Sequence, residues 1–179
     1  FFFKQKTAYE IQECDWISDV CSSDLNINQG GYVYLHSGAT DSLSRFTIDV
    51  NYNSSILADR TPLTLVVDSH NKWMFDYQYD SSTSANSLLA HCAPNNAYTT
   101  NDLSGQIFYG DAFGTAALTE ITLPAGANAA GGIVSLHPYL FYYGANGIVG
   151  WSVAGDFTDL TGAGSGTARV WGTKIIKGM

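Results

Sequence analysis

The chain has 179 residues, 13% of them charged, and a formal net charge of −8. This sparse and acidic charge argues against a nucleic-acid-binding face, which needs clustered lysine and arginine, and against docking on an anionic membrane surface. No apolar stretch approaches the roughly 18 residues of a membrane-spanning helix.

The first 25 residues differ in composition from the rest of the chain. They contain no glycine and no proline, whereas residues 26–179 hold all 18 glycines and all 4 prolines. Acidic residues interrupt every apolar run, so the segment lacks the pattern of a secretory signal. An amphipathic helix would use Ala8, Ile11 and Val20, but their spacing is irregular and no cap or glycine stop follows.

Two blocks of this leader, "KQKTAYEI" and "DWISDVCSSDL", resemble in order and spacing the conceptual translation of a sequencing-library adapter. The resemblance implies that residues 1–25 are non-native and not part of the fold. We therefore expect residues 26–179 to be a fragment of one all-β domain from a longer protein. They contain six basic and eleven acidic residues, and their one cysteine, Cys92, has no partner for an internal disulfide.

The composition of residues 26–179 predicts an all-β fold of short antiparallel strands. Tyrosine, threonine and valine favour strands, while the abundant glycine, asparagine and serine favour turns. A strand is predicted over residues 31–37. A second, over 44–50, has an alternation typical of one wet side. We expect Phe46, Ile48 and Val50 on the buried face, and Arg45, Thr47 and Asp49 on the wet face.

Residues 61–80 predict a hairpin, in which 63–67 run out, 68–71 turn and 72–79 return. In the returning strand one face carries Trp73, Phe75, Tyr77 and Tyr79. The opposite face carries Lys72, Met74, Asp76 and Gln78. A polar loop over residues 81–86 and a short buried strand over 87–92 follow.

The second half of the chain continues the same pattern. Residues 94–102 predict a loop, 105–114 and 117–124 each a strand, and 125–132 a long turn. The segments 132–144 and 147–153 flank a turn at Ala145 and Asn146, with Gly144 and Gly147 able to take positive φ. A loop over 155–166 precedes a last strand over 168–178. About ten short strands at this spacing suggest a sandwich such as a jelly roll, a barrel or a propeller.

The four histidines do not form a metal-binding pattern. His36, His70, His91 and His137 are never at chelating spacing from one another, and His91 and Cys92 would point to opposite faces of one strand. We expect them to be surface residues or hydrogen-bonded within the fold, and we assign no metal or cofactor.

Other chemical motifs are better explained by structure than by catalysis. Asp68, Ser69 and His70 are the three residue types of a catalytic triad. They lie in a predicted turn, however, and the sequence contains no G-x-S-x-G nucleophile elbow. The loop Gly162–Gly166 lacks the lysine and the following helix of a phosphate loop. Asp156 and Asp159 favour turn capping over calcium binding. We therefore assign no catalytic residue and expect that the protein is not an enzyme.

Three aromatic residues leave a second interpretation open. Trp73, Tyr77 and Tyr79 could stack on sugars if they were exposed, although aromatic stripes on strands more often belong to a core. A carbohydrate-binding β-sandwich, such as a lectin-like or fibre-tip module, is therefore the alternative function, and a glycan would be its ligand.

The segment 131–178 resembles part of the tail and neck proteins of tailed bacteriophages. The shared elements are Tyr142-Tyr143-Gly144, then Gly147-Ile148-Val149, then Trp151-Ser152. Next comes Gly155-Asp156, with Thr158-Asp159, where such proteins often have a Gly-Asp-Pro-x-Asp-Phe-like turn. The family meant is that of propeller-like virion proteins, such as tail tubular protein B and the packaged-DNA stabilisation proteins of short-tailed phages.

This resemblance implies a non-catalytic structural protein of the virion, in the tail or the head–tail junction. Its expected partners are other virion subunits, in a homo-oligomeric ring, together with passive contact with packaged DNA. Its expected location is the virion, assembled in the cytoplasm of a bacterial host.

Overall fold

The structure, a computed structural model, describes residues 26–29, 32–49, 51, 53–66, 72–80, 83–93, 105–144 and 147–170. Within these ranges every regular element is a β-strand, so the predicted all-β class is confirmed. The strands are β1 (Asn26–Gln29), β2 (Tyr32–Gly38), β3 (Leu43–Ile48), β4 (Ser54–Asp59), β5 (Lys72–Asp80), β6 (Ala85–Ala93), β7 (Gln106–Asp111), β8 (Thr119–Ile121), β9 (Gly132–Leu136), β10 (Tyr139–Tyr143), β11 (Ile148–Trp151) and β12 (Gly166–Arg169).

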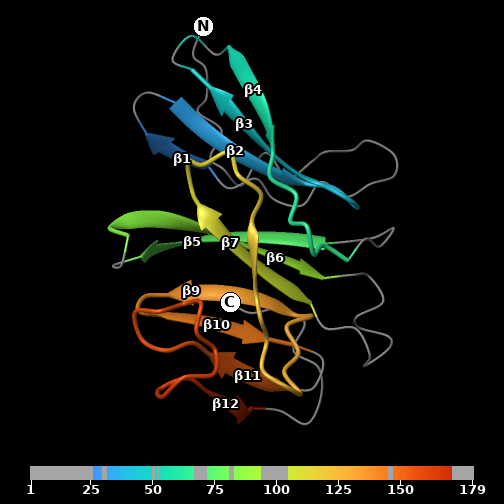
Figure 1. Cartoon of the computed structure of the whole chain (residues 1–179), viewed down its shortest axis with the longest axis vertical. Helices are drawn as coiled ribbons and strands as arrows, with labels where there is room; N and C mark the ends of the chain where they lie inside the picture. Colours follow the sequence, from blue (N-terminus) through green and yellow to red (C-terminus); the bar gives the residue numbers. More distant parts are fainter. Residues whose placement is uncertain are drawn as a thin grey trace, which may run out of the picture.

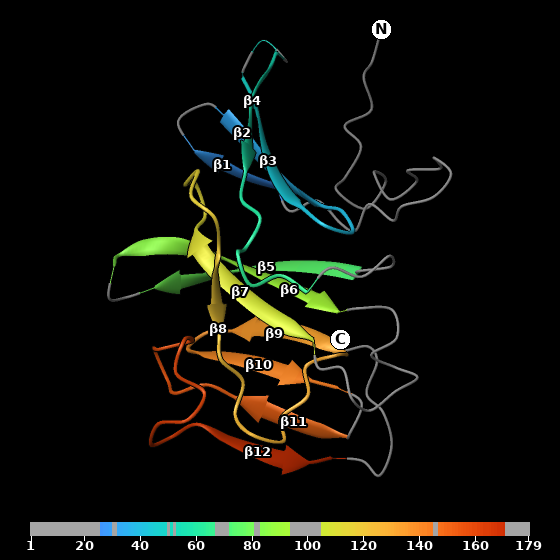
Figure 2. The same cartoon turned by 45° about the vertical axis from the view of Figure 1, so that its right-hand side comes forward.

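The strands form three four-stranded antiparallel sheets, each completed before the next begins. Sheet 1 contains β1–β4, sheet 2 contains β5–β8 and sheet 3 contains β9–β12, and within each sheet neighbours in the chain are neighbours in space. The sheets stack face to face in chain order, with sheet 2 in the middle (Figures 1 and 2).

Strand β6 shows how the middle sheet serves both neighbours. Its side chains alternate between the two faces, so that Leu88 and Ala90 point toward sheet 1 and Leu89 points toward sheet 3. The strand is buried on both sides over residues 87–93. This double burial agrees with the short buried strand predicted over 87–92.

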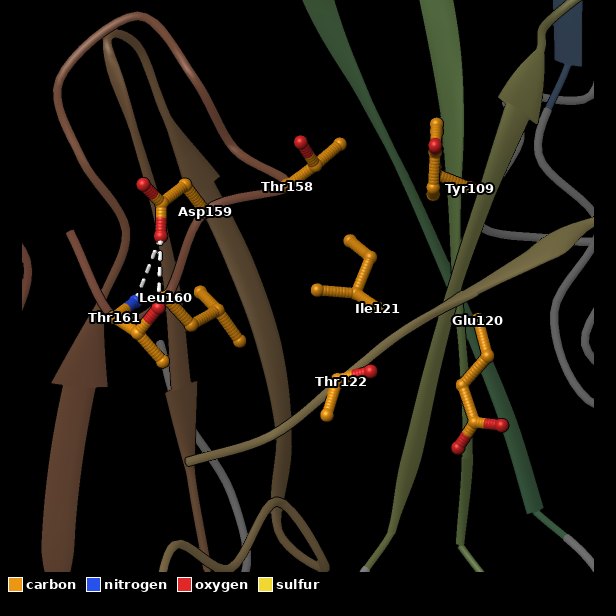
Figure 3. Close-up of a pocket in the computed structure, with 8 residues that line it drawn as sticks. All are labelled: Tyr109, Glu120, Ile121, Thr122, Thr158, Asp159, Leu160 and Thr161. Carbon is orange, nitrogen blue, oxygen red and sulfur yellow. Dashed lines mark hydrogen bonds between the residues drawn. The ribbon is translucent and has the colours of Figure 1, made fainter. Parts of the chain in front are cut away.

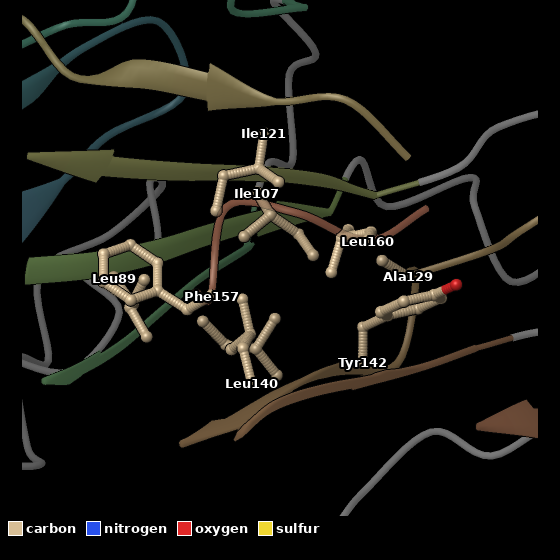
Figure 4. Close-up of a cluster of buried hydrophobic side chains, with 9 residues drawn as sticks. Leu89, Ile107, Ile121, Ala129, Leu140, Tyr142, Phe157 and Leu160 are labelled. Carbon is tan, nitrogen blue, oxygen red and sulfur yellow. The ribbon is translucent and has the colours of Figure 1, made fainter. Parts of the chain in front are cut away.

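Two apolar clusters fill the spaces between the sheets. The cluster between sheets 1 and 2 consists of Leu43, Trp73, Leu88, Ala90, Cys92, Phe108, Ala112 and Leu118. The cluster between sheets 2 and 3 consists of Leu89, Ile107, Ile121, Ala129, Ile133, Leu140, Tyr142, Phe157 and Leu160 (Figure 4). Since burying one large apolar side chain contributes about 2 kcal/mol, these clusters are the main force that holds the sheets together.

Polar bonds supplement the apolar contact between sheets 2 and 3. The Ser135 amide of β9 donates to Asp76 Oδ2 at 2.7 Å, and the Ser135 hydroxyl bonds Gln78 Oε1 at 3.1 Å. Asp76 and Gln78 lie on the face of β5 opposite to Trp73. The predicted alternation of β5 is therefore confirmed, with Trp73, Phe75 and Tyr77 directed toward sheet 1.

An aspartate-capped turn recurs at a strand end in every sheet. In each turn an aspartate Oδ1 accepts a hydrogen bond from the amide two residues later, at 2.9–3.0 Å. The aspartates are Asp59 at the end of β4, Asp111 at the end of β7 and Asp156 after β11. The residue after each aspartate is buried, and these residues are Arg60, Ala112 and Phe157. The turn thus directs one side chain inward.

The face predicted to be wet in β3 is the buried one. Arg45 is 6% exposed and Thr47 is 7% exposed, whereas Phe46 is 37% exposed. The physical reason is the length of Arg45, whose guanidinium reaches acceptors on sheet 2 and so tolerates burial. Val50 lies outside the described residues.

The prediction of a strand in the first arm of the hairpin, over residues 63–67, is also wrong. Residues 61–66 form no strand, and Leu63 is fully exposed. The Leu65 amide donates instead to the Pro62 carbonyl at 3.2 Å, which makes a turn. The predicted turn at 68–71 and the predicted loop at 94–102 lie outside the described residues, as does most of the last predicted strand, which begins as β12.

The segment 132–144 is itself a hairpin. β9 and β10 pair around His137 and Pro138, whose peptide bond is cis. Gly147 has the expected positive φ of 70°, while Gly144 is required for a different reason. A Cβ at Gly144 would overlap the Asn128 side chain and carbonyl, so close packing rather than turn conformation selects this glycine.

Candidate functional site

A shallow pocket opens between the outer edge of sheet 2 and the loop that follows β11. Its volume is about 340 Å³. Its lining consists of Tyr109, Glu120, Ile121, Thr122, Thr158, Asp159, Leu160 and Thr161 (Figure 3). Sheet 2 supplies Tyr109, Glu120 and Ile121, Thr122 directly follows β8, and the loop supplies the others, so the pocket exists because the two sheets stack.

Asp159 is held rigidly at the pocket wall. Its Oδ1 accepts hydrogen bonds from the Thr161 amide at 2.9 Å, the Thr161 hydroxyl at 3.2 Å and the Gly162 amide at 2.8 Å. These bonds, led by those from the two backbone amides, hold the pKa of Asp159 below its usual value. The carboxylate therefore stays ionised at neutral pH and is a poor proton donor.

Glu120 does not face Asp159 across the pocket. It pairs with Phe108, which packs toward sheet 1, whereas Ile121 belongs to the cluster between sheets 2 and 3. Figure 3 shows the Glu120 side chain directed away from Asp159. Its Oε1 accepts a hydrogen bond from Gln106 Nε2 at 3.1 Å. The two carboxylates lie on opposite sides of β8, which is unsuitable for the facing pair of a glycoside hydrolase.

A second polar group lies buried between sheets 1 and 2, around Arg60. Arg60 is 1% exposed. Its Nε donates to the Ala116 carbonyl at 3.0 Å and its Nη2 to the Asp111 carbonyl at 2.8 Å, while Nη1 lies 3.1 Å from His36 Nε2. Burial, together with the nearby charge of Arg45, lowers the pKa of Arg60 to about 10, which still leaves it charged at neutral pH.

The geometry around His36 determines which ring nitrogen carries the proton. A guanidinium only donates, so His36 Nε2 accepts and the proton is on Nδ1. The Nδ1 atom lies 3.5 Å from the Tyr77 hydroxyl. Burial raises the pKa of Tyr77, so the phenol stays protonated. In the row Arg60–His36–Tyr77, Arg60 is therefore the cation, and the imidazole and the phenol are neutral.

Arg45 makes a parallel contact with the same loop of sheet 2. Its Nη1 donates to the carbonyls of Phe113 and Gly114, and its guanidinium lies 5.2 Å from the centre of the Tyr34 ring. Both buried arginines thus bind backbone carbonyls of the loop 111–116. Their position between two sheets indicates a structural clamp, because neither is directed toward the pocket.

His91 is the one buried histidine at the contact between sheets 2 and 3. Its Nε2 bonds the Ala129 carbonyl, and its Nδ1 has no hydrogen-bond partner within the described part of the chain. Burial lowers the pKa of His91 to about 4, an effect that the bond to Ala129 partly opposes. The ring is therefore neutral at pH 7. Cys92 points to the opposite face, as predicted, and is buried near Trp73.

The remaining sequence candidates are resolved in part. Asp156 and Asp159 cap turns, as predicted, and accept bonds from Thr158 and Thr161. Trp73 is 2% exposed and its indole donates to the Ala39 carbonyl, so it cannot stack on a sugar, while Tyr79 is 49% exposed. Gly162–Gly166 forms turns with no helix after them. Asp68, Ser69 and His70 lie outside the described residues, and His137 is exposed.

Sequence reasoning did not identify the buried arginines. Asp59 and Thr61 flank Arg60 in the same Asp-x-Thr pattern that recurs at Asp156 and at Asp159. The middle residue of that pattern is buried each time. The pattern could therefore have predicted that Arg60 is buried.

Comparisons with known proteins add no assignment. No protein-family model, curated protein or solved structure matches the chain. Among the residues described, His, Cys, Asp and Glu do not gather in any group of three or more that could hold a metal ion. The same residues include no helix with the length and hydropathy of a membrane span.

Proposed function

We propose that the chain is a non-catalytic structural component of a tailed-bacteriophage particle, in the tail or the head–tail junction, and that its sheets are a portion of a β-propeller. The observation that carries this proposal is the chain-order stack. Each four-stranded meander is complete before the next one starts, and each packs a face on its neighbour. Propeller blades have this organisation, whereas Greek-key sandwiches exchange strands between two sheets.

The polar groups support a mechanical role. The two buried arginines bind backbone carbonyls between sheets, and Oδ1 of Asp159 is held by hydrogen bonds from its own loop. Such groups stiffen a scaffold and supply neither a nucleophile nor an acid–base pair. The sparse charge favours permanent contacts with other virion subunits, since interface cores are depleted in charged residues. Contact with packaged DNA would be passive in this account, and the location would be the virion.

Immunogold labelling of purified particles tests this role. An antibody raised against the 179-residue chain should label one pole of tailed particles that carry the gene, with pre-immune serum as the control. Labelling of a tail or neck would support the proposal. Unlabelled particles, with the antigen found only in the host-cell fraction, would contradict it.

The pocket supports carbohydrate binding as a second candidate. It combines the ring of Tyr109 with threonine hydroxyls and an ionised carboxylate, which are groups that recognise sugars. Thr122 and Thr119 are both exposed, but only Thr122 lines the pocket. On a glycan array, binding that Thr122→Arg abolishes and Thr119→Arg retains would favour this candidate. An array with no binding would remove it.

A further inference from the structure

His36 and Arg60 form the polar centre of the contact between sheets 1 and 2, where both side chains are buried. The Nε2 atom of His36 accepts a hydrogen bond from Arg60 Nη1 at 3.1 Å, so Nε2 carries no proton. The guanidinium cannot turn away from the ring without losing its bonds to the carbonyls of Asp111 and Ala116. The contact in this form therefore requires a neutral His36.

A proton on Nε2 of His36 would place a second cation beside the guanidinium of Arg60, 3.1 Å away. A third cation, Arg45, is the cross-strand neighbour of His36. Burial, and after it the charge of Arg45, already lower the pKa of Arg60. Within the described residues the two guanidinium groups donate to backbone carbonyls and to His36, and to no carboxylate. Like charges at this distance repel strongly where water is excluded, so protonation of His36 opposes the contact.

The other titratable side chains around His36 do not offset that charge. Tyr77 of β5 has its hydroxyl 3.5 Å from His36 Nδ1, and burial raises its pKa, so the phenol stays protonated. Tyr34 of β2 has its ring 5.2 Å from the guanidinium of Arg45. Asp111, at the end of β7, is an acid, but its carboxylate is exposed, where water screens its charge. None of these three groups supplies a buried anion opposite the imidazole.

We propose that mild acid opens the contact between sheets 1 and 2 when His36 takes up a proton, and that sheet 1 then separates as an intact unit. Within the described residues sheet 1 is a complete four-stranded meander at one end of the stack (Figure 1). Its strands keep their own hydrogen bonds when the contact opens. Units of this kind open at a lower free energy than the whole fold. The inference is independent of the proposed function.

The pH range of the opening follows from the state that binds the proton. An imidazole that opening exposes to water has a pKa of about 6.5, whereas the closed contact excludes the proton. Below this pH the open state therefore binds more protons than the closed state, and the closed state loses stability as the pH falls. For one such group the equilibrium constant for opening rises about eightfold between pH 6 and pH 5. A return to pH 7 should close the contact again.

Two hydrogen bonds that cross this contact report its opening. The Leu118 amide donates to the Arg60 carbonyl at 3.1 Å, and the Trp73 indole donates to the Ala39 carbonyl at 2.7 Å. Hydrogen exchange measured by NMR gives a protection factor for each group, from which the intrinsic pH dependence of exchange is removed. In the wild-type chain both protection factors should fall about eightfold between pH 6 and pH 5. Protection factors that are constant over this range would overturn the proposal without any variant.

Two matched variants assign the opening to one histidine. His36→Gln keeps an acceptor for Arg60 and cannot be protonated, so the protection factors of Leu118 and Trp73 should change less than about twofold between pH 6 and pH 5. His91→Gln, in the contact between sheets 2 and 3, should leave the eightfold fall at these two groups unchanged. A His36→Gln chain that keeps the eightfold fall would show that His36 is not the group responsible.

The Ser135 amide distinguishes local opening from unfolding of the whole chain. It donates to Asp76 Oδ2 at 2.7 Å and so crosses the contact between sheets 2 and 3 instead. Its protection factor in His36→Gln should follow the wild-type profile at every pH. If His36→Gln raised the protection of Ser135 as much as that of Leu118, acid would act on the whole fold, and the separation of sheet 1 as a unit would be wrong.

Discussion

Arg60 Nη1 lies 3.1 Å from His36 Nε2 in the space between sheets 1 and 2, and both side chains are almost completely buried. The same guanidinium donates to the carbonyls of Asp111 and Ala116, on the loop after β7. One side chain therefore connects β2, the end of β4 and the neighbouring sheet. This is the clearest polar link between two of the stacked sheets.

Removal of Arg60 should destabilise the fold. Arg60→Leu leaves the two carbonyls and the His36 ring without a donor, and we expect the free energy of unfolding to fall by about 3 kcal/mol. Arg60→Lys should cost about 2 kcal/mol, because a single ammonium cannot reproduce the planar fork. Urea denaturation measures both. Arg169→Leu, at an exposed position of β12, is the control and should change stability by less than about 0.5 kcal/mol. If Arg60→Leu and Arg169→Leu lowered the free energy of unfolding equally, the structural role of Arg60 between sheets 1 and 2 would be refuted.

Acid should destabilise the protein through His91. The unfolded imidazole has a pKa of 6.5 and the buried one about 4, so between these values the unfolded state binds more protons. Stability is therefore complete above pH 6.5 and falls as the pH is lowered toward 4, by up to about 3 kcal/mol from this group. The lowered pKa values of Asp49, Asp59 and Asp159 act only below 3.8, so the two windows are separate.

Two variants isolate this effect from the hydrogen bond to Ala129. His91→Gln keeps a donor and removes this titration, so its stability should fall less steeply between pH 6.5 and 4 than that of the wild type. His91→Leu removes both and should be less stable than His91→Gln at pH 7. Denaturant midpoints measured across this range give the result. A His91→Gln profile that still slopes like the wild type would show that another group is responsible.

Tyr142→Phe should leave stability unchanged or raise it by about 1 kcal/mol. The Tyr142 hydroxyl is buried between sheets 2 and 3 and has no hydrogen-bond partner within the described part of the chain, and burial raises its pKa. Removing an unsatisfied buried hydroxyl removes a desolvation penalty. Tyr77→Phe is the matched comparison, because its hydroxyl faces His36, and it should destabilise. Thermal unfolding ranks the two, and the reverse order would contradict this interpretation.

Gly150→Ala should destabilise by about 2 kcal/mol. Gly150 pairs with Tyr142 across β10 and β11, and an added Cβ would overlap the tyrosine ring. Gly126→Ala separates packing from backbone strain, because Gly126 has a φ of 79° but open space around its Cα. Its cost should be about 1 kcal/mol. Chemical denaturation of both variants decides the point, and a larger loss for Gly126→Ala would contradict the packing explanation.

The positions of strands could be predicted where apolar and polar residues alternate along the chain and the apolar face is the buried one. β5, β6 and β7 lie close to the segments predicted over 72–79, 87–92 and 105–114, because these strands carry apolar residues on a face that meets a neighbouring sheet. The aspartate-capped turns were predictable for the same reason, since an aspartate bonds an amide only two residues away.

Features that depend on distant partners were not predictable. Arg45 was placed on the wet face because its acceptors, at Phe113 and Gly114, are nearly 70 residues away in the chain. The pocket unites Tyr109 with Asp159, and no spacing in the sequence connects them. The exposure of Leu63 reflects a turn at Pro62 rather than the strand that its apolar neighbours suggested.

The most direct test of a structural role is the copy number of the chain in purified particles. Isotope-labelled versions of the tryptic peptides 46–60 and 61–72 would quantify the chain by mass spectrometry in particles that carry its gene. The account predicts several copies per particle, in a fixed ratio to the capsid subunit across preparations. A chain that is absent from particles, or present at a ratio that falls with each purification step, would contradict it.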